Sequence, residues 1–152
     1  MEHARQSLVG VWSMYEAQRD NVSIDEVYVF SDGNLGACLY SNPVADDLEL
    51  FRWTCDAERL TFEPLRSVWI ARENGSAEQR AGGVASAVRF TIAFERDAWD
   101  RDACLLRMDP NRGVGARYAK SLLSERQREA LQRHLGLELG PELVAPLRQQ
   151  TW

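Results

Sequence analysis

Short segments in which apolar and polar residues alternate follow one another from residue 8 to residue 108. In the clearest of them, 48–55, Phe51 and Trp53 share one face while the polar residues between them share the other. A period of two is typical of a β-strand with one buried face. Turn residues such as those at 31–34 (SDGN) separate the segments, and tight hairpin turns favour Gly and Asn there. Successive strands joined by short turns predict an antiparallel sheet.

The strands expected from this pattern cover most of the chain before residue 109. They are 8–17, 25–30, 35–40, 48–55, 60–63, 67–72, 84–95 and 103–108, with the Gly- and Ser-rich stretch 73–83 expected as a loop. Strands of this kind form a sandwich or a barrel, and closure into a barrel removes exposed edges. The expected fold class is therefore mainly β, an antiparallel up-and-down barrel of about eight strands.

The pattern changes after Asp109-Pro110. Residues 116–123 and 124–135 have helical composition. Ser124 with Gln127 three residues later predicts a capping box, and a glycine follows at 136, where a helix commonly ends. We therefore expect a helical appendage after the barrel.

Length and composition fit one domain with its own core. The chain has 152 residues, 45% of them hydrophobic, and a chain of this size buries about two thirds of its unfolded surface. We expect a single domain over 1–152, with the barrel over 8–108 and a helical C-terminal extension over 109–152. The net charge of −5 argues against a nucleic-acid partner. Without a signal pattern or a transmembrane run, a cytoplasmic protein with no membrane partner is expected.

Three stretches carry a resemblance to a known family: LVGVW at 8–12, YVFSDGNLGACLY at 28–40 and LFRWTCDAERLTF at 50–62. They resemble lipocalin-like (calycin) barrels of the bacterial cytoplasmic type, over roughly residues 8–108. In that family a Gly-x-Trp opens the first strand and its Trp plugs the closed end of the barrel. The resemblance implies these roles for Gly10 and Trp12, with Arg107 packed over Trp12, and a barrel that holds a small molecule.

Few residues suit metal binding or covalent catalysis. The two histidines, His3 and His134, are far apart, and Cys38, Cys55 and Cys104 have no CxxC spacing. We expect reduced cysteines, no metal site and no cofactor. The two neighbouring carboxylates Asp46 and Asp47 are expected in a solvated turn. The remaining acid–base candidates are strand carboxylates, one of which could face inward with a pKa raised by burial: Glu26, Glu49, Glu63 and Glu95.

Aromatic residues occur on nearly every expected strand. They either fill the core, as in many small barrels, or line a cavity for an apolar ligand. For a cavity, the expected ligand-binding residues are Tyr28, Tyr40, Phe51, Trp53, Trp69 and Phe90. The candidate polar anchors are Tyr28, Tyr40, Thr54 and Arg107. The sequence identifies no catalytic residue.

Three functions stay open. The preferred one is a lipocalin-like protein that binds a hydrophobic small molecule in an aromatic-lined cavity. The second is a barrel enzyme, a cofactor-free cyclase or isomerase in small-molecule biosynthesis, which needs only a shaped cavity and one or two polar groups. The third is a protein–protein interaction or immunity-type module, and a homodimer is also left open. A hollow barrel favours the first two and a filled barrel the third, while a buried Glu or Tyr facing a cavity favours the enzyme.

Overall fold

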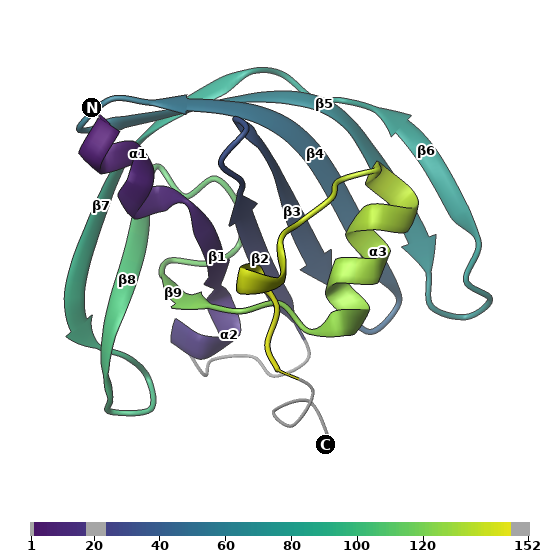
Figure 1. The fold of residues 1–152 in the computed structure, drawn as a ribbon. Helices are drawn as coiled ribbons and strands as arrows, with labels where there is room; N and C mark the ends of the chain where they lie inside the picture. The colour runs from purple at the N-terminus through teal and green to yellow at the C-terminus, as the bar shows by residue number, and fades with distance from the viewer. Residues whose placement is uncertain (1, 18–23, 147–152) are drawn as a thin grey trace.

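The computed structural model describes residues 2–17 and 24–146, and strands dominate this part of the chain (Figure 1). The elements in chain order are α1 (Glu2–Leu8), β1 (Gly10–Ser13), α2 (Met14–Ala17), β2 (Asp25–Phe30), β3 (Leu35–Ser41), β4 (Ala45–Cys55), β5 (Arg59–Ala71), β6 (Ala77–Ala81), β7 (Ser86–Arg96), β8 (Asp102–Asp109), β9 (Tyr118–Ser121), α3 (Glu125–Leu135) and a final 3₁₀ helix, η1 (Pro141–Leu143). None of the helices in this part of the chain is long and apolar enough to cross a membrane.

Among the described residues, eight strands close into a ring. The order of neighbours is β4-β3-β2-β1-β9-β8-β7-β5, and β5 pairs with β4 to complete it (Figure 1). Every neighbouring pair is antiparallel. β6 lies outside the ring and pairs with the second half of β5. The expected antiparallel up-and-down barrel is therefore confirmed, and so is the helix after it.

The strand that completes the ring comes from a segment expected to be helical. Residues 116–123 contain β9, which pairs with β1 on one side and β8 on the other. Four residues are too few for alternation to emerge in the sequence, so pairing with two neighbours overrides local composition. The helical prediction for this segment is wrong.

Other boundaries also differ from expectation. The first strand ends at Ser13, and α2 occupies the rest of the segment expected as strand 8–17. The expected loop 73–83 contains β6. The strands expected on either side of Pro64 are one strand, β5, and a register shift opposite Leu50 and Phe51 accommodates the proline.

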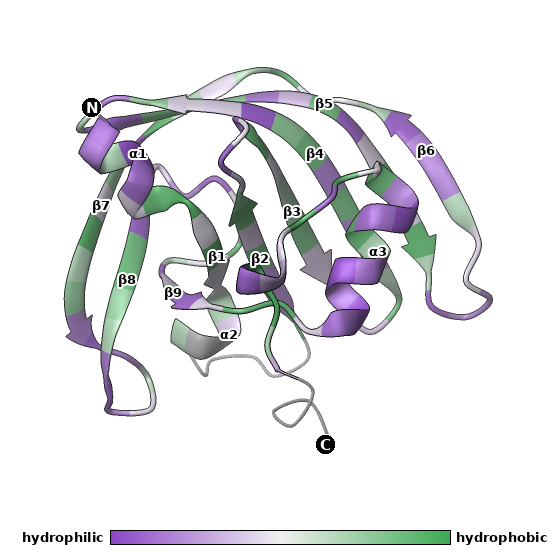
Figure 2. Ribbon diagram, viewed as in Figure 1, coloured by the Kyte–Doolittle hydropathy of each residue, from purple (hydrophilic) through white to green (hydrophobic). Residues whose placement is uncertain are grey.

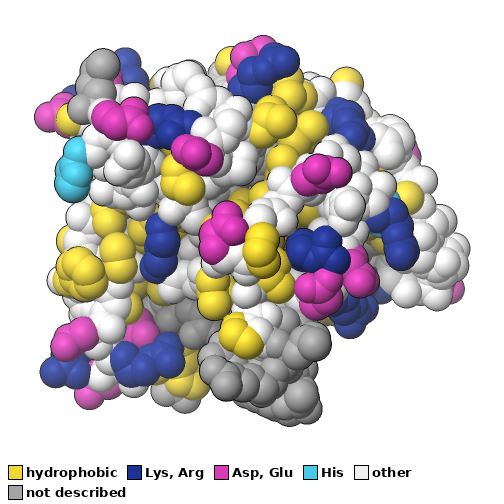
Figure 3. Space-filling view, viewed as in Figure 1, with side chains coloured by type: hydrophobic (Ala, Val, Ile, Leu, Met, Phe, Trp, Pro, Cys, Tyr) yellow, Lys and Arg dark blue, Asp and Glu magenta, His cyan; other side chains and the backbone are white. Residues whose placement is uncertain are grey.

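Helix α3 packs on the outer face of the sheet rather than inside the ring. Leu131 and Leu135 are buried against outward-facing residues of β2, β3 and β4, such as Leu48. The predicted capping box joins Ser124 and Gln127, and Gly136 ends the helix with a φ of 67°. In Figure 2, α3 and β6 are largely hydrophilic. On the face that carries α1 and α3, acidic and basic side chains are interspersed (Figure 3).

One end of the ring, which we call the closed end, is covered by α1 and filled by Trp12. The Trp12 side chain is fully buried, and its Nε1 donates a hydrogen bond to the Leu8 carbonyl at 2.8 Å. The Lys120 Nζ lies 4.6 Å from the centroid of the Trp12 ring. Lys120 also donates to the Val9 carbonyl at 2.6 Å. A second cation, Arg5 of α1, lies over the Trp53 ring, with 5.3 Å between its Cζ and the ring centroid. Packing and two cations held on ring faces therefore seal this end.

The cation on Trp12 is therefore Lys120 and not Arg107, which corrects the sequence-based expectation. Leu106 and Met108 face the barrel interior, so alternation turns Arg107 outward, where it forms an ion pair with Glu95 at 2.9 Å.

The Gly-x-Trp pattern also has a physical reason here. A Cβ on Gly10 would lie 2.7 Å from the Lys120 Nζ, and the φ of Gly10 is +134°. A glycine at this position allows the lysine to cross the strand and reach the indole.

Candidate functional site

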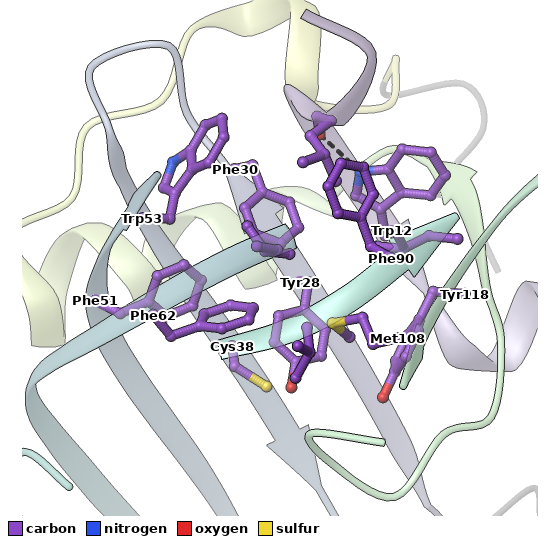
Figure 4. Close-up of a cluster of buried hydrophobic side chains, with 14 of the residues drawn as sticks. Trp12, Tyr28, Phe30, Cys38, Phe51, Trp53, Phe62, Phe90, Met108 and Tyr118 are labelled. Atoms are coloured by element: carbon purple, nitrogen blue, oxygen red, sulfur yellow. Dashed lines mark hydrogen bonds between the residues drawn. The ribbon is translucent and has the colours of Figure 1, made fainter. Parts of the chain in front are cut away.

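Aromatic rings fill the middle of the barrel. Those of Tyr28, Phe30, Phe51, Trp53 and Phe62 contact one another in one cluster (Figure 4). Ring centroids lie 5.0 Å apart for Phe51 and Phe62 and 5.2 Å apart for Phe30 and Trp53, both in edge-to-face geometry. These rings form a packed core, in line with the plainer of the two interpretations of the aromatic residues.

The six residues predicted to bind a ligand are divided between this core and one end of the barrel. Phe51, Trp53 and Phe90 are buried in the core cluster. Tyr28 belongs to the core and also lines a pocket, in which Tyr40 forms part of the wall.

Trp69, the sixth of these residues, is only half-buried. It lies beneath the guanidinium of Arg80, with 5.4 Å between the Arg80 Cζ and the ring centroid.

A pocket of about 260 Å³ lies at the end of the barrel that α1 does not cover. Strands β2, β3 and β4 supply one side of it, and the connection between β8 and β9 supplies the other. We call it the charged pocket, and it is lined by Glu26, Tyr28, Cys38, Tyr40, Asp47, Glu49, Arg112, Gly113 and Val114. Three carboxylates and one guanidinium therefore share a small space with two tyrosines.

Arg112 separates the charged pocket from the aromatic core. Its Nη2 lies 2.6 Å from the Glu49 Oε1, and its Nη1 donates to the Tyr28 hydroxyl at 3.3 Å. Its Cζ lies 4.1 Å from the centroid of the Phe62 ring and 5.4 Å from that of Phe51. Burial opposes the charge of Arg112, but Tyr28 and Glu49 beside it raise the pKa of the guanidinium above its ordinary value. Arg112 is thus a permanent cation held on the rings beneath it.

Glu26 fastens the connection that carries Arg112. Its side chain is buried, and its Oε1 accepts hydrogen bonds from the Val114 amide at 3.1 Å, from the Gly115 amide at 3.4 Å and from the Tyr118 hydroxyl. A Cβ on Gly113 would lie 2.0 Å from the Glu26 Oε2. Glycine at position 113 therefore allows the backbone to approach the carboxylate. Burial and the neighbouring Glu26 both raise the pKa of Tyr118, so its hydroxyl stays protonated and donates.

Asp47 is the pocket carboxylate that has one oxygen without a hydrogen-bond donor. It lies in β4, which corrects the prediction of a solvated turn, and it faces the charged pocket. Its Oδ1 is buried and has no hydrogen-bond partner in the structure. Burial raises the pKa of Asp47, and Arg80 opposes that shift only in part. A buried carboxylate oxygen without a donor is costly, so the charge of Asp47 is only partly compensated beside the pocket.

The thiol in the charged pocket has no sign of activation. Burial raises the pKa of Cys38 well above its ordinary value, and nearby Glu26 adds to the shift. A neutral thiol is a weak nucleophile. Cys38, Cys55 and Cys104 are all free thiols; Cys38 is buried, and the other two are partly buried. Among residues 2–17 and 24–146, no group of three or more His, Cys, Asp or Glu side chains is arranged to hold a metal ion.

Two of the four predicted polar anchors lie elsewhere, because alternation turns Thr54 and Arg107 to the outside of the barrel. Sequence reasoning also missed Arg112, since its surroundings (NRGVG) read as a plain turn. One signal for Asp47 was available. Asp47, Glu49, Phe51 and Trp53 form a single period-two series along β4, so the face that carries the buried aromatics also carries the two carboxylates.

Comparisons with protein-family models, with curated proteins and with solved structures find no match to this chain.

Proposed function

We propose that this chain is a lipocalin-like barrel that binds a small molecule in the charged pocket. The observation that carries the proposal is the composition of this pocket, in which tyrosine rings face carboxylates and an unpaired acceptor across about 260 Å³. Ligand sites combine apolar walls with a few convergent polar groups in this way. The volume is below the usual range for drug-sized ligands, about 300–1,000 Å³, so the ligand is a small one.

We also propose the relationship to lipocalin-like barrels. In its support, the Gly-x-Trp pattern opens the first strand of an up-and-down ring, and Trp12 fills one end of it. The packed aromatic core counts against a ligand deep inside the barrel and favours an interaction module, whereas the hollow at the end of the barrel favours a ligand, and the proposal rests on this hollow. The ligand's apolar part would rest on Tyr40 at the end of the barrel, instead of entering deep into the aromatic core.

Saturation-transfer NMR with a set of small aromatic fragments tests the proposal. The set contains cationic, neutral and anionic compounds built on one phenyl frame, so that binding of any of them is informative. We expect at least one fragment to receive saturation from the wild-type protein and to lose it in Tyr40→Ser, while Tyr15→Ser, on α2, keeps it. If no fragment of any charge shows a signal that depends on Tyr40, the proposal is wrong.

A cofactor-free barrel enzyme is a second candidate, and the position of Glu26 favours it. Glu26 is a buried carboxylate on the pocket wall, held in one orientation by three donors, as a general base or acid must be. The test incubates an identified ligand with wild type and with Glu26→Gln and follows it by NMR. Conversion by wild type alone supports catalysis, and an unchanged ligand in both samples contradicts it.

A further inference from the structure

We propose that the ligand of the charged pocket carries a positively charged group, such as an ammonium, on a small aromatic or apolar body. This inference rests on the proposed binding function and adds the ligand's chemical class to it. It follows from the charges, the unpaired acceptor and the rings that meet in this pocket.

The charges in the pocket do not cancel. Glu26, Asp47 and Glu49 face a single guanidinium, that of Arg112. Arg112 is engaged with Glu49 at 2.6 Å, which balances one carboxylate. The donors to Glu26 are two backbone amides and a hydroxyl, all neutral. The pocket thus retains negative charge, and a cation entering it is attracted while an anion is repelled.

Asp47 gives that charge a location. Asp47 lines the pocket, and its buried Oδ1 accepts no hydrogen bond, so no donor among the described residues offsets the charge on this oxygen. Arg80, the cation outside the pocket whose charge acts on Asp47, is paired with Glu78 at 3.1 Å and lies over the Trp69 ring. An ammonium group placed against the pocket side of the Asp47 carboxylate would supply the missing positive charge through a charge-assisted hydrogen bond.

The walls suit the same ligand. Ring faces are negative and attract cations. Arg112 already covers the rings of Tyr28 and Phe62, with its Cζ 5.7 Å and 4.1 Å from their centroids, so Tyr40 is the aromatic ring of the pocket wall that a ligand cation would meet. An anionic ligand would need a free cation. The Arg112 side chain is only 13% exposed and its Nη2 is held by Glu49. Its Nε has no hydrogen-bond partner but is buried, so Arg112 offers an incoming anion little accessible surface.

Isothermal titration calorimetry with three ligands of one frame tests the inference: phenethylamine, phenethyl alcohol and phenylacetate. We expect the amine to bind about tenfold more tightly than the alcohol, as one hydrogen bond to a charged group allows, and phenylacetate to bind more weakly still. Asp47→Asn should remove the preference for the amine.

Asp46→Asn is the matched control. Asp46 precedes Asp47 in β4 and faces the other side of the sheet, where it pairs with Arg72 at 2.7 Å. Its substitution should therefore leave all three affinities unchanged. The inference is overturned if the alcohol or phenylacetate binds wild type as tightly as the amine, or if Asp46→Asn lowers amine affinity as much as Asp47→Asn does. Either result leaves the binding function standing. Absence of binding by all three contradicts both the inference and the proposed function. The wild-type series decides the charge preference even if a variant fails to fold.

Discussion

The two ends of the barrel are closed by opposite means. At the closed end the Trp12 indole is buried under α1. Lys120 lies on the indole ring and donates a hydrogen bond to a backbone carbonyl. At the other end a loop carries Arg112 over the same aromatic core, and carboxylates surround it, one with an unpaired oxygen. Packing dominates the first arrangement and unbalanced charge the second. Substitutions at the closed end should therefore change stability, and substitutions in the charged pocket should change binding.

The largest effect on stability is expected at the closed end. We expect Trp12→Ala to lower the free energy of unfolding by about 3–5 kcal/mol, the range for emptying a buried large aromatic site. Urea denaturation followed by circular dichroism measures it. An unchanged midpoint would mean that Trp12 is not the residue that fills this end.

A smaller loss is expected where the pocket loop meets the barrel. The added methyl of Gly113→Ala would overlap the Glu26 carboxylate, and such overpacking costs about 1–3 kcal/mol. Fragment binding should weaken as well, because the loop that carries Arg112 must move. Gly83→Ala, where a Cβ meets nothing within 4 Å, is the control and should behave as wild type. Equal stability of the two variants would show that the loop does not need the close approach.

Lys120 and Arg107 lie on different faces of the sheet, and their contributions to stability can be compared. Lys120→Met removes a ring contact and a hydrogen bond to the Val9 carbonyl, and we expect a loss of about 1–2 kcal/mol. Arg107→Met removes an exposed ion pair with Glu95, which is worth about 0–1 kcal/mol. Thermal melts of both variants rank them. A larger loss for Arg107→Met would mean that the lysine on the Trp12 ring contributes less stability than the exposed Arg107–Glu95 ion pair.

The smallest effect on stability is expected for Asp47→Asn, and its direction shows whether the ionised Asp47 carboxylate stabilises or destabilises the fold. Because burial raises the pKa of Asp47, the folded protein holds this proton more tightly than the unfolded chain does. The ionised carboxylate therefore costs stability as the pH rises above the usual Asp range, about 4, and through the raised pKa. Asp47→Asn should be at least as stable as wild type at neutral pH, with its relative stability falling as the pH is lowered. A variant less stable than wild type at neutral pH would indicate that Asp47 is a structural residue.

The sequence predicted the barrel because its information is local and repeated. Alternation in 48–55 and 84–95 and the turn at 31–34 each specify a piece of antiparallel sheet, and the Ser124–Gln127 capping box specifies the start of α3. It did not predict β9, because four residues show no period and their pairing partners are distant in the chain. The family resemblance implied the position of Trp12 correctly but named Arg107 as the cation on its ring. That cation is Lys120, which lies in β9, the strand that the sequence did not predict.

The charged pocket was harder to predict for a similar reason. Tyr28 and Tyr40 could be named because aromatic residues stand out on their strands. Arg112 reaches Glu49 across 63 positions of the chain, and Glu26 meets Val114 across 88. Such contacts depend on how the ring closes and on where the loop before β9 crosses it. Local patterns carry no information about either.

The most direct test of the contrast between the ends is a ¹H–¹⁵N NMR titration of the wild-type protein with phenethylamine. We predict that the backbone amides that shift lie around the charged pocket, in 26–28, 38–40, 47–49 and 112–115. The amides of the closed end, in 8–12 and 32–34, should stay in place. Shifts concentrated at the closed end, or the absence of shifts at both ends, would contradict the account.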